Sequence, residues 1–505
     1  MNSIPFIPIR EVPTCLRPPG TKNARRTPLT TVSARLSTLV TLEPHADGKI
    51  VACFEGHSVS LGTFTARIAD RVRCLRAGLP LASFASRRRR GDKELDLLVR
   101  RLARHRLLVY RVGYSQNDDV EQVIIEPQVA DYWPRESRLR DADVVVLSRF
   151  AYMRRRGSEM VLESPRSGAL FKICDPKVAT IVAMLAEPQK IKHLRRQDGF
   201  PGIRLLALLA DCQILFKIDA AGDSGRRPTE GDGDLVLWDF HDLLFHTRTT
   251  AGRHTNLLGG LYRYADVTPP LPAIRPRWPG KRIDLSKFSA ALALTNSPIA
   301  RILRERHSTR IFDDQHPIAL AELSQFLDST ARVLWTTKTG GDLNDDGPAV
   351  EYAVRPYPSA GSSYELELYL AVDKCEGLAR GFYHYDAGGH ALVPIDARRH
   401  EFEALLRESE FAMGVAATPQ VLITITARFG RVSWKYSSIA YRLILKDVGV
   451  LIHTFYMIAT DIGLSGCATG IANIDLFAKM TGIEFHVEGP VGQFAIGRSG
   501  RVERP

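Results

Sequence analysis

Residues 437–462 read SSIAYRLILKDVGVLIHTFYMIATDI and carry the clearest helical pattern in the chain. Apolar residues recur three or four positions apart, the spacing of one face of an α-helix. They are Ile444, Val448, Leu451, Ile452, Phe455, Ile458, Ala459 and Ile462. A helix of this length would span roughly 40 Å. It also bears ionisable residues, so we expect a central or dimer-interface helix and not a membrane span. These are Lys446, Asp447, His453 and Asp461.

Strand-like runs accompany this helix in the C-terminal part of the chain. Residues 365–372 and 420–427 have the apolar and β-branched composition of strands. A further helix is expected to begin near Leu320. Strands joined to long helices indicate an α+β fold for residues 286–505.

The N-terminal half contains one order of elements twice. A strand pair, two helices and a closing strand are predicted in residues 36–115 and again in residues 144–220, so we expect two small winged-helix-like α+β modules. In the first, strands are expected at 39–42, 50–54 and 107–112, with a turn at Asp47-Gly48 and helices at 64–75 and 95–102. In the second, strands are expected at 144–152, 160–163 and 214–218, with helices at 177–185 and 205–209.

Two segments lack such periodicity. Residues 1–35 combine several prolines with arginines and are predicted to be a mobile tail. Residues 221–285 hold a Gly/Asp-rich break and a Pro-rich stretch, and are predicted to be a linker.

Composition limits the class of protein. The chain has 505 residues, of which 45% are hydrophobic and 25% charged, so a disordered or collagen-like chain is excluded. The start lacks the apolar core of a signal peptide, and we expect a cytoplasmic protein. The seven cysteines form no C-x-x-C pair, so neither a disulfide framework nor a metal site is expected.

The net charge of +12 is concentrated at the N-terminus. Residues 1–110 contain 20 Lys+Arg and 8 Asp+Glu, which leaves 48 of each kind in the remainder. A basic first module suits an acidic peptide or a polyanion. The run Arg87–Arg90 could contact phosphate, but a solvated loop before a helix is the favoured interpretation, and nucleic acid is not an expected partner.

Common nucleotide-binding and hydrolase signatures are absent, and four segments of the last 200 residues remain as candidates for chemistry. Arginines flanking a hydroxyl residue can bind a phosphate, and loops of small residues let backbone approach a planar ligand. A lysine beside a tyrosine can supply a general base. The segments are Arg306–Arg310, Tyr357–Ser363, Trp434-Lys435-Tyr436 and Gly463–Gly470.

Together and in this order, the segments resemble the FMN-dependent nitroreductase superfamily, and in detail its SagB-type azoline dehydrogenases. The resemblance covers about residues 302–497 and includes Gly381–Tyr385 and Ala440–Gly449. It implies an antiparallel-rich sheet flanked by helices and an obligate homodimer with FMN at the interface, in which the long helix is central.

The resemblance also implies residue roles. Arg306, Ser308 and Arg310 match the contacts to FMN phosphate and ribityl, and His307 stands where the family often has another arginine. Lys435 and Tyr436 match the pair that marks azoline dehydrogenases. The remaining matches to cofactor-binding positions are Pro358, Ser359, Ala360, Gly361, Gly463, Leu464, Gly497 and Arg498.

The N-terminal half resembles the winged-helix peptide-clamp modules of longer SagB-type proteins. The shared stretches are Phe150-Ala151, Leu162–Pro165 and Trp238–His246. His241 and His246 lie five positions apart, on different helix faces, so packing or hydrogen bonding is favoured over metal ligation.

The predicted function is therefore FMN-dependent oxidation of thiazoline or oxazoline rings in a ribosomal precursor peptide. The resemblance implies leader binding by the N-terminal modules and a cyclodehydratase partner. Two other classes stay open: an NAD(P)H-dependent nitro or quinone reductase, and a non-catalytic peptide-binding scaffold.

Overall fold

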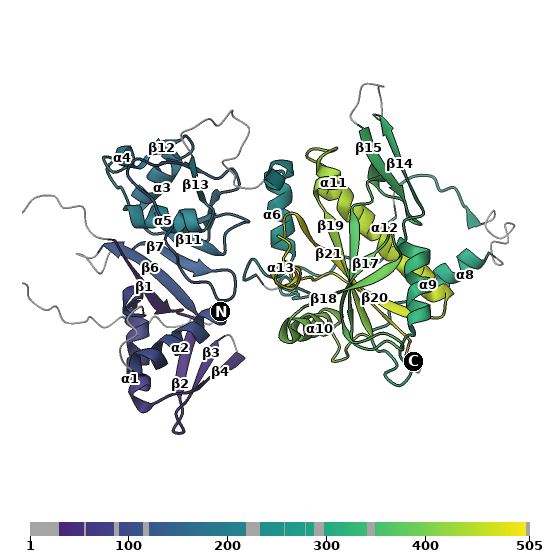
Figure 1. Ribbon diagram of the computed structural model, residues 1–505, viewed down its shortest axis with the longest axis horizontal. Helices are drawn as coiled ribbons and strands as arrows, with labels where there is room; N and C mark the ends of the chain where they lie inside the picture. The colour runs from purple at the N-terminus through teal and green to yellow at the C-terminus, as the bar shows by residue number, and fades with distance from the viewer. Residues whose placement is uncertain are drawn as a thin grey trace, which may run out of the picture.

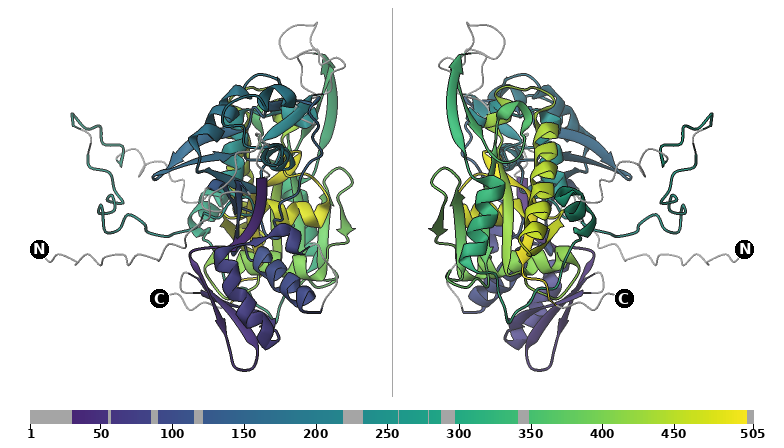
Figure 2. Two further views of the ribbon diagram at one scale, coloured as in Figure 1. Left: turned by 90° about the vertical axis from the view of Figure 1, so that its left-hand side faces the viewer. Right: turned by 90° about the vertical axis from the view of Figure 1, so that its right-hand side faces the viewer.

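The computed structural model describes residues 30–54, 57–84, 90–114, 121–218, 233–256, 258–277, 279–286, 297–340 and 349–500. Figure 1 shows an N-terminal part, which ends with β13, beside a C-terminal part, with α6 between them. In both views of Figure 2 the β14–β15 hairpin stands out from the C-terminal part.

A seven-stranded antiparallel sheet runs through the N-terminal part in the order β5-β1-β6-β7-β11-β10-β9. Its longest pairing joins β1 to β6 from Thr30↔Tyr114 to Leu36↔Leu108. The strands are β1 (Thr30–Leu36), β5 (Leu79–Pro80), β6 (Leu108–Tyr114), β7 (Glu121–Pro127), β9 (Tyr152–Arg156), β10 (Glu159–Glu163) and β11 (Ala169–Ile173).

Each predicted module adds a small sheet and helices to this large sheet. The first adds β2 (Val40–Pro44), β3 (Lys49–Phe54), β4 (His57–Thr63), α1 (Ala66–Ala77), η1 (Leu81–Phe84) and α2 (Arg90–Arg104). The second adds β8 (Val144–Leu147), α3 (Pro176–Met184), β12 (Gln189–Lys190), α4 (Ile191–Leu194), α5 (Ile203–Asp211) and β13 (Leu215–Ile218). The turn at Asp47-Gly48 joins β2 to β3, and Gly48 has a φ of +81°, which favours glycine.

The structure differs from the predicted division in two respects. The modules share one sheet and one hydrophobic core, because β7 pairs with both β6 and β11. Residues 30–36, placed mostly in the predicted tail, form β1, whose alternate residues Val32, Ala34 and Leu36 are buried. Residues 1–29 lie outside the described part of the chain, as do Arg87–Arg89 of the arginine run.

The C-terminal part is built on a six-stranded antiparallel sheet in the order β18-β17-β16-β19-β21-β20. This confirms the predicted α+β fold class. The strands are β16 (Leu366–Val372), β17 (Gly381–Asp386), β18 (Ala391–Ile395), β19 (Val421–Arg428), β20 (Ser465–Thr469) and β21 (Glu488–Gly497), and β14 (Trp335–Gly340) pairs with β15 (Ala349–Val354) in a separate hairpin. The helical elements are α8 (Pro298–Glu305), α9 (Leu320–Ala331), η5 (Ala360–Ser362), α10 (Arg399–Met413), α11 (Gly430–Ser433), α12 (Ala440–Asp461) and α13 (Ile474–Thr481).

Helices cover both faces of this sheet. The period-two alternation of β16 sends Leu368 and Leu370 into the cluster that contains α9 and α12, and sends Tyr369 and Ala371 into the cluster that contains α10 and α13. Helix α12 therefore packs across one sheet face, with Ile444, Val448, Leu451 and Phe455 buried.

The predicted linker is in part a structural element of the C-terminal core. η3 (Gly233–Leu237) and α6 (Phe240–Thr249) bring Leu235, Trp238 and Leu243 into the same cluster as α12. His246 is fully buried, and its Nδ1 lies 3.0 Å from the Tyr441 hydroxyl. By contrast, residues 259–277 and 279–286 are exposed, as expected of a linker.

Helix α12 begins later than the sequence predicts. Ser438 has a φ of +60° and Ile439 is not helical, so Lys435 and Tyr436 precede the helix instead of starting it. The Asp242 carboxylate of α6 accepts a hydrogen bond from the Tyr441 N–H at 3.4 Å, in the first turn of α12. Among the described residues, α12 alone is long and apolar enough to cross a membrane, a test that buried core helices also pass.

Candidate active site

The segment that follows α8 carries the predicted phosphate contacts. The Ser308 hydroxyl lies 2.8 Å from the Tyr456 hydroxyl, and the Arg306 guanidinium stands 5.0 Å from the centre of the Tyr456 ring. A parallel bridge between Ser308 and Gly466 attaches the segment to the edge strand β20. Within the described ranges, Arg306 has no carboxylate partner, so its charge is available to an anion.

The other residues of this segment are His307, Thr309 and Arg310. Arg310 is exposed and lies near the buried Cys467, where it opposes the rise in the thiol pKa that burial causes. The Thr309 hydroxyl is buried without a hydrogen-bond partner among the described residues. His307 is exposed, and its Nδ1 lies 3.0 Å from the Glu305 carbonyl oxygen. Two uncommitted arginines around an orphaned hydroxyl fit the phosphate end of FMN.

The loop after α12 and the end of β21 lie at the same sheet edge. Gly463, with a φ of +78°, ends α12, and Leu464 is buried beneath the loop. Ser465 pairs with Gly497 across β20 and β21. A Cβ atom on Gly497 would stand 2.9 Å from the Phe312 ring, so this position requires glycine for close packing.

Arg498 has a different environment from the other predicted phosphate contacts. Its guanidinium makes two hydrogen bonds to the Glu322 carboxylate, at 2.7 and 2.8 Å, and its carbonyl accepts from the Asp313 N–H at 2.9 Å. The Arg498 N–H also donates to the Gln420 side-chain oxygen at 3.0 Å, so both the charge and the backbone of Arg498 are already committed within the chain.

The second loop, 358–361, is held by α12. The Asp447 carboxylate accepts hydrogen bonds from the Ala360 N–H at 2.8 Å and from the Ser359 hydroxyl at 2.9 Å. Ser359 also lies 3.3 Å from Glu365, whose side chain is completely buried. Burial, with the nearby Asp447 charge, raises the pKa of Glu365 to about 7.

The Lys435-Tyr436 pair meets this loop at Gly361. Gly361 has a φ of +57°, and a Cβ atom on it would overlap the Tyr436 hydroxyl and stand 3.3 Å from Lys435 Nζ. Lys435 is exposed, with Nζ 5.7 Å from the centre of the Tyr352 ring, and Tyr436 is half-buried. The structure therefore does not bury the lysine as a desolvated base, but it brings both groups to the loop predicted to lie beside the flavin ring.

A cavity of about 390 Å³ opens beside the pair. Aromatic and apolar side chains on its wall suit a flat ring, and charged groups at its edge suit a polar backbone. Its lining includes Leu237, Tyr352, Arg428, Trp434, Lys435 and Glu488. Leu237 reaches the cavity from η3, so the segment predicted as linker contributes to the site.

The two groups of predicted cofactor residues lie apart within one chain. Ser308 contacts Tyr456 and Ser359 contacts Asp447, nine residues earlier on α12, which corresponds to roughly 14 Å along the helix axis. The residues matched to the FMN phosphate, 306–310, are the phosphate-type residues, and the loop matched to the flavin ring, 358–361, is the ring-type loop. These two groups are thus arranged along one helix and not around one pocket of the single chain.

Sequence reasoning assigned no role to three of the side chains that organise the site: Tyr456, Glu365 and Asp447. Asp447 carried a usable signal, because a carboxylate there interrupts the apolar stripe of Ile444, Val448 and Leu451 on the face that packs inward. Tyr456 and Glu365 offered none, since aromatic and charged residues occur at such positions in most helices and strands.

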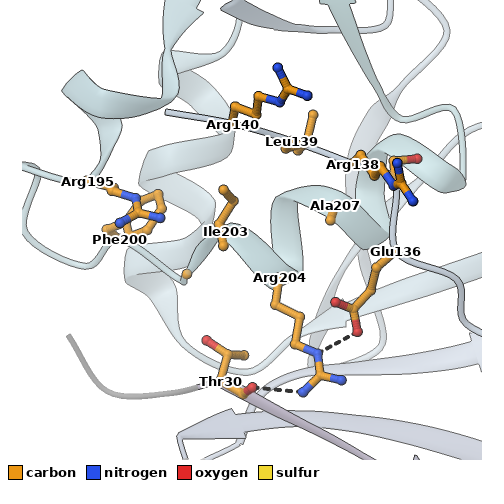
Figure 3. A pocket seen from close by; sticks show the side chains of 12 residues that line it. Thr30, Glu136, Arg138, Leu139, Arg140, Arg195, Phe200, Ile203, Arg204 and Ala207 are labelled. Atoms are coloured by element: carbon orange, nitrogen blue, oxygen red, sulfur yellow. Dashed lines mark hydrogen bonds and ion pairs between the residues drawn. The ribbon is translucent and has the colours of Figure 1, made fainter. Parts of the chain in front are cut away.

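A separate cavity of about 690 Å³ lies in the N-terminal part, between the start of β1, α5 and residues 136–140. Figure 3 shows apolar side chains between arginines that come from different segments. Arg204 pairs with Glu136 at 2.6 Å and Arg195 with Asp141 at 2.9 Å. The Arg140 N–H donates a hydrogen bond to the Asp143 carboxylate at 2.7 Å, but within the described residues neither the Arg138 nor the Arg140 guanidinium forms an ion pair, so the cavity is basic.

Comparisons with known protein families match two stretches of the chain. Residues 145–255 match the family described as Cyanobactin oxidase ThcOx, and residues 303–498 match the Nitroreductase family. A protein of Methanocaldococcus jannaschii whose name places it among nitroreductases is 29% identical over 171 residues, which cover 34% of this chain and 76% of the relative.

Solved structures were also found. One is the Escherichia coli microcin synthetase McbBCD complex with truncated pro-MccB17 bound, at 20% identity and a TM-score of 0.38, covering 53% of this chain and 97% of that one. Another is a Ralstonia eutropha protein named as a nitroreductase, at 21% identity and a TM-score of 0.30, covering 41% and 84%. The family matches are the firmer result: residues 303–498 form a nitroreductase-family domain, residues 145–255 are of the cyanobactin-oxidase type, and the resemblance to SagB-type members of the nitroreductase superfamily is confirmed.

Proposed function

We propose that the protein is an FMN-dependent dehydrogenase that oxidises thiazoline or oxazoline rings to thiazoles or oxazoles in a ribosomally made precursor peptide. The observation that carries the proposal is the position of Lys435 and Tyr436. Both adjoin Gly361 in the ring-type loop, and Lys435 also lines the 390 Å³ cavity. A reductase without proton abstraction from carbon has no need of this pair.

Arg306, Ser308 and Arg310 would hold the FMN phosphate and ribityl, and residues 358–361 would lie beside the ring. FMN supplies a hydride acceptor when bound. The separation of these groups along α12 supports a homodimer in which each flavin contacts both chains. The same helix would then form the dimer interface.

The reaction removes two hydrogens from the ring. The azoline Cα hydrogen is acidified by the adjacent carbonyl and C=N groups, so Lys435 or Tyr436 would take it as a proton. Bound FMN would supply the acceptor for the Cβ hydrogen and its electron pair. The C–H bonding electrons at Cα form the new double bond, and aromatisation drives the step. Dioxygen would serve as the final two-electron oxidant. The cavity walls of Tyr352 and Trp434 orient the ring.

The N-terminal part supports a peptide substrate. β4 is an edge strand of its sheet, and an extended leader can add to such an edge through main-chain hydrogen bonds. The basic cavity beside Arg138 and Arg140 suits acidic side chains of the same peptide. A cyclodehydratase that makes the azoline is the corresponding partner enzyme.

The test is an anaerobic mixture of the FMN-loaded protein with an azoline-containing peptide. We expect bleaching of the oxidised flavin and a product lighter by two hydrogen atoms. Rapid NADPH oxidation with no change in the peptide would instead identify a reductase. A folded protein that takes up no FMN would identify a peptide-binding scaffold.

A further inference from the structure

Two buried carboxyl groups lie beneath the ring-type loop. Asp447 comes from α12 and Glu365 from the residue before β16, and both side chains are excluded from solvent. Glu365 Oε1 has no hydrogen-bond partner among the described residues. No arginine or lysine of that part of the chain forms an ion pair with either carboxyl group. Two ionised carboxylates in this environment would repel each other without a compensating cation.

The hydrogen bonds around Ser359 leave one carboxylate oxygen without a hydrogen to accept. The Ser359 hydroxyl accepts from the Tyr364 N–H at 3.0 Å and has a single hydrogen to donate. It lies 2.9 Å from Asp447 Oδ2 and 3.3 Å from Glu365 Oε2, so it can donate to only one of them. Asp447 Oδ2 also accepts from the Ala360 N–H, whereas Glu365 Oε1 has no partner among the described residues. A hydrogen on Glu365 completes the set, since it can be donated to Asp447 or Ser359.

We propose that Glu365 and Asp447 share one proton, and that this protonated pair is the positioning device that holds residues 359–361 against Lys435 and Tyr436. The device acts through the loop, because the Ala360 N–H is bonded to Asp447 and the next residue, Gly361, contacts both catalytic candidates. Loss of the proton places a second negative charge under the loop and opens it. The role assigned to Lys435 and Tyr436 rests on the proposed function, but the proton and the loop do not.

Other charged groups near the pair are already committed or neutral. Arg355 lies 3.5 Å from Glu367 and donates to the Leu366 carbonyl, and burial raises the pKa of Tyr357, which keeps that phenol neutral. The titratable and charged groups packed around the pair are Arg355, Tyr357, Glu367, Lys435 and Tyr436.

The pH dependence has a definite sign. The pKa of Glu365 is about 7 in the closed loop and about 4.5 where the group is free. Closure is therefore strongest at low pH, weakens by up to tenfold per pH unit between these values, and becomes constant above about 7. Amide hydrogen exchange of Ala360 and Tyr364, corrected for the intrinsic base-catalysed rate, measures this closure without FMN or substrate.

The decisive variant is Glu365→Gln, which has the shape of the protonated acid. We expect its protection at Ala360 to stay constant over the pH range in which the parent loses at least tenfold. Glu367→Gln is the matched control, because Glu367 lies two positions away and has ionic partners. In this variant the protection at Ala360 should fall with pH as it does in the parent. A parent with pH-independent protection, or a Glu365→Gln variant with the parental fall, would overturn the proposal.

A second variant covers failure of Glu365→Gln to fold. Asp447→Asn removes the neighbouring charge and keeps an acceptor for Ala360. The loss of protection at Ala360 with rising pH should therefore end at a lower pH than in the parent. An unchanged end point would overturn the proposal. Because these measurements use protein without azoline, a failure of the loop device is distinguishable from a failure of the dehydrogenase assignment.

Discussion

Gly361 and Tyr436 are in such close contact that no side chain fits on the glycine: a Cβ atom there would overlap the tyrosine hydroxyl. The left-handed φ of +57° at Gly361 places the backbone in this position. A residue of the ring-type loop and a residue 75 positions later thus form one surface, and the loop cannot move without changing the surroundings of Tyr436.

This contact predicts the effect of Gly361→Ala. The added methyl group must displace Tyr436 or Lys435, so we expect at least a tenfold loss in azoline oxidation with FMN retained. Gly414→Ala is the control, because Gly414 also has a positive φ but nothing within 4 Å of an added Cβ. Both variants carry a backbone cost of roughly 1 kcal/mol. Equal activity losses in the two would attribute the effect to strain and not to the site.

Lys435→Ala and Tyr436→Phe should each lower azoline oxidation at least tenfold, since a general base contributes about 10² to 10⁴ in rate. Because both residues precede α12 and Lys435 is exposed, we expect little change in thermal stability or flavin content. Lys374→Ala, which removes an exposed ion pair with Asp314, serves as the control for loss of a lysine. Undiminished oxidation by the double variant with FMN bound would end the catalytic assignment.

Arg306→Ala should give folded protein with little bound FMN. Its guanidinium has no carboxylate partner in the described ranges, so its main loss is the charge-assisted bond to phosphate, worth on the order of 2 kcal/mol or more. Flavin content per chain after gel filtration measures the effect. The exposed Arg304, two positions earlier at the end of α8, provides Arg304→Ala as a comparison. Stoichiometric FMN in Arg306→Ala would remove this residue from the site.

The buried His246 predicts acid sensitivity of the packing between α6 and α12. Burial lowers its pKa to about 3 from the ordinary 6.5, so the folded state holds it neutral while the unfolded chain takes up a proton below 6.5. The free energy of unfolding is therefore highest above the ordinary pKa of 6.5. It decreases by about 1.4 kcal/mol for each pH unit below that value.

Unfolding in denaturant at about pH 7 and about pH 5 tests this dependence. His246→Gln, which can still bond to Tyr441, should show a smaller loss between the two. His241→Gln is the matched control on the same helix, because His241 is exposed. An unchanged pH dependence in His246→Gln would contradict the prediction.

The double variant Arg138→Glu/Arg140→Glu should weaken binding of an acidic leader peptide on the order of tenfold or more, with FMN content unchanged. The effect should shrink as salt is raised. Fluorescence anisotropy of a labelled peptide measures it, and Arg155→Glu/Arg399→Glu, at exposed positions of β9 and α10, controls for the same change in net charge. Charge reversal is cleaner than deletion of the N-terminal part, because Phe150 packs in the C-terminal core.

Local patterns predicted part of the fold, including β16, β19, α9 and α12 in the C-terminal part, and left β14, β15, β17, β18 and β20 unassigned. The stripe of α12, the Asp47-Gly48 hairpin and the start of α9 follow from periodicity and turn chemistry, which depend on neighbours in the chain. Strand β7 was not assigned, and β1 was placed in the tail. Each is stabilised by pairing with distant segments, as β7 is with β6 and β11, and the local pattern does not reveal such pairing.

The sequence by itself determined the kinds of residues at the candidate site and the family to which they belong, because motifs such as Arg306–Arg310 and Lys435-Tyr436 are contiguous. Only the tertiary structure decided which motifs meet. Ser359 donates to Asp447, 88 residues away, so a charged position of α12 supports a loop. His246 lies within hydrogen-bond distance of Tyr441, 195 residues away, so part of the predicted linker belongs to the core. Periodicity shows which face of an element is buried, but the partner of that face is chosen by packing among all the elements at once.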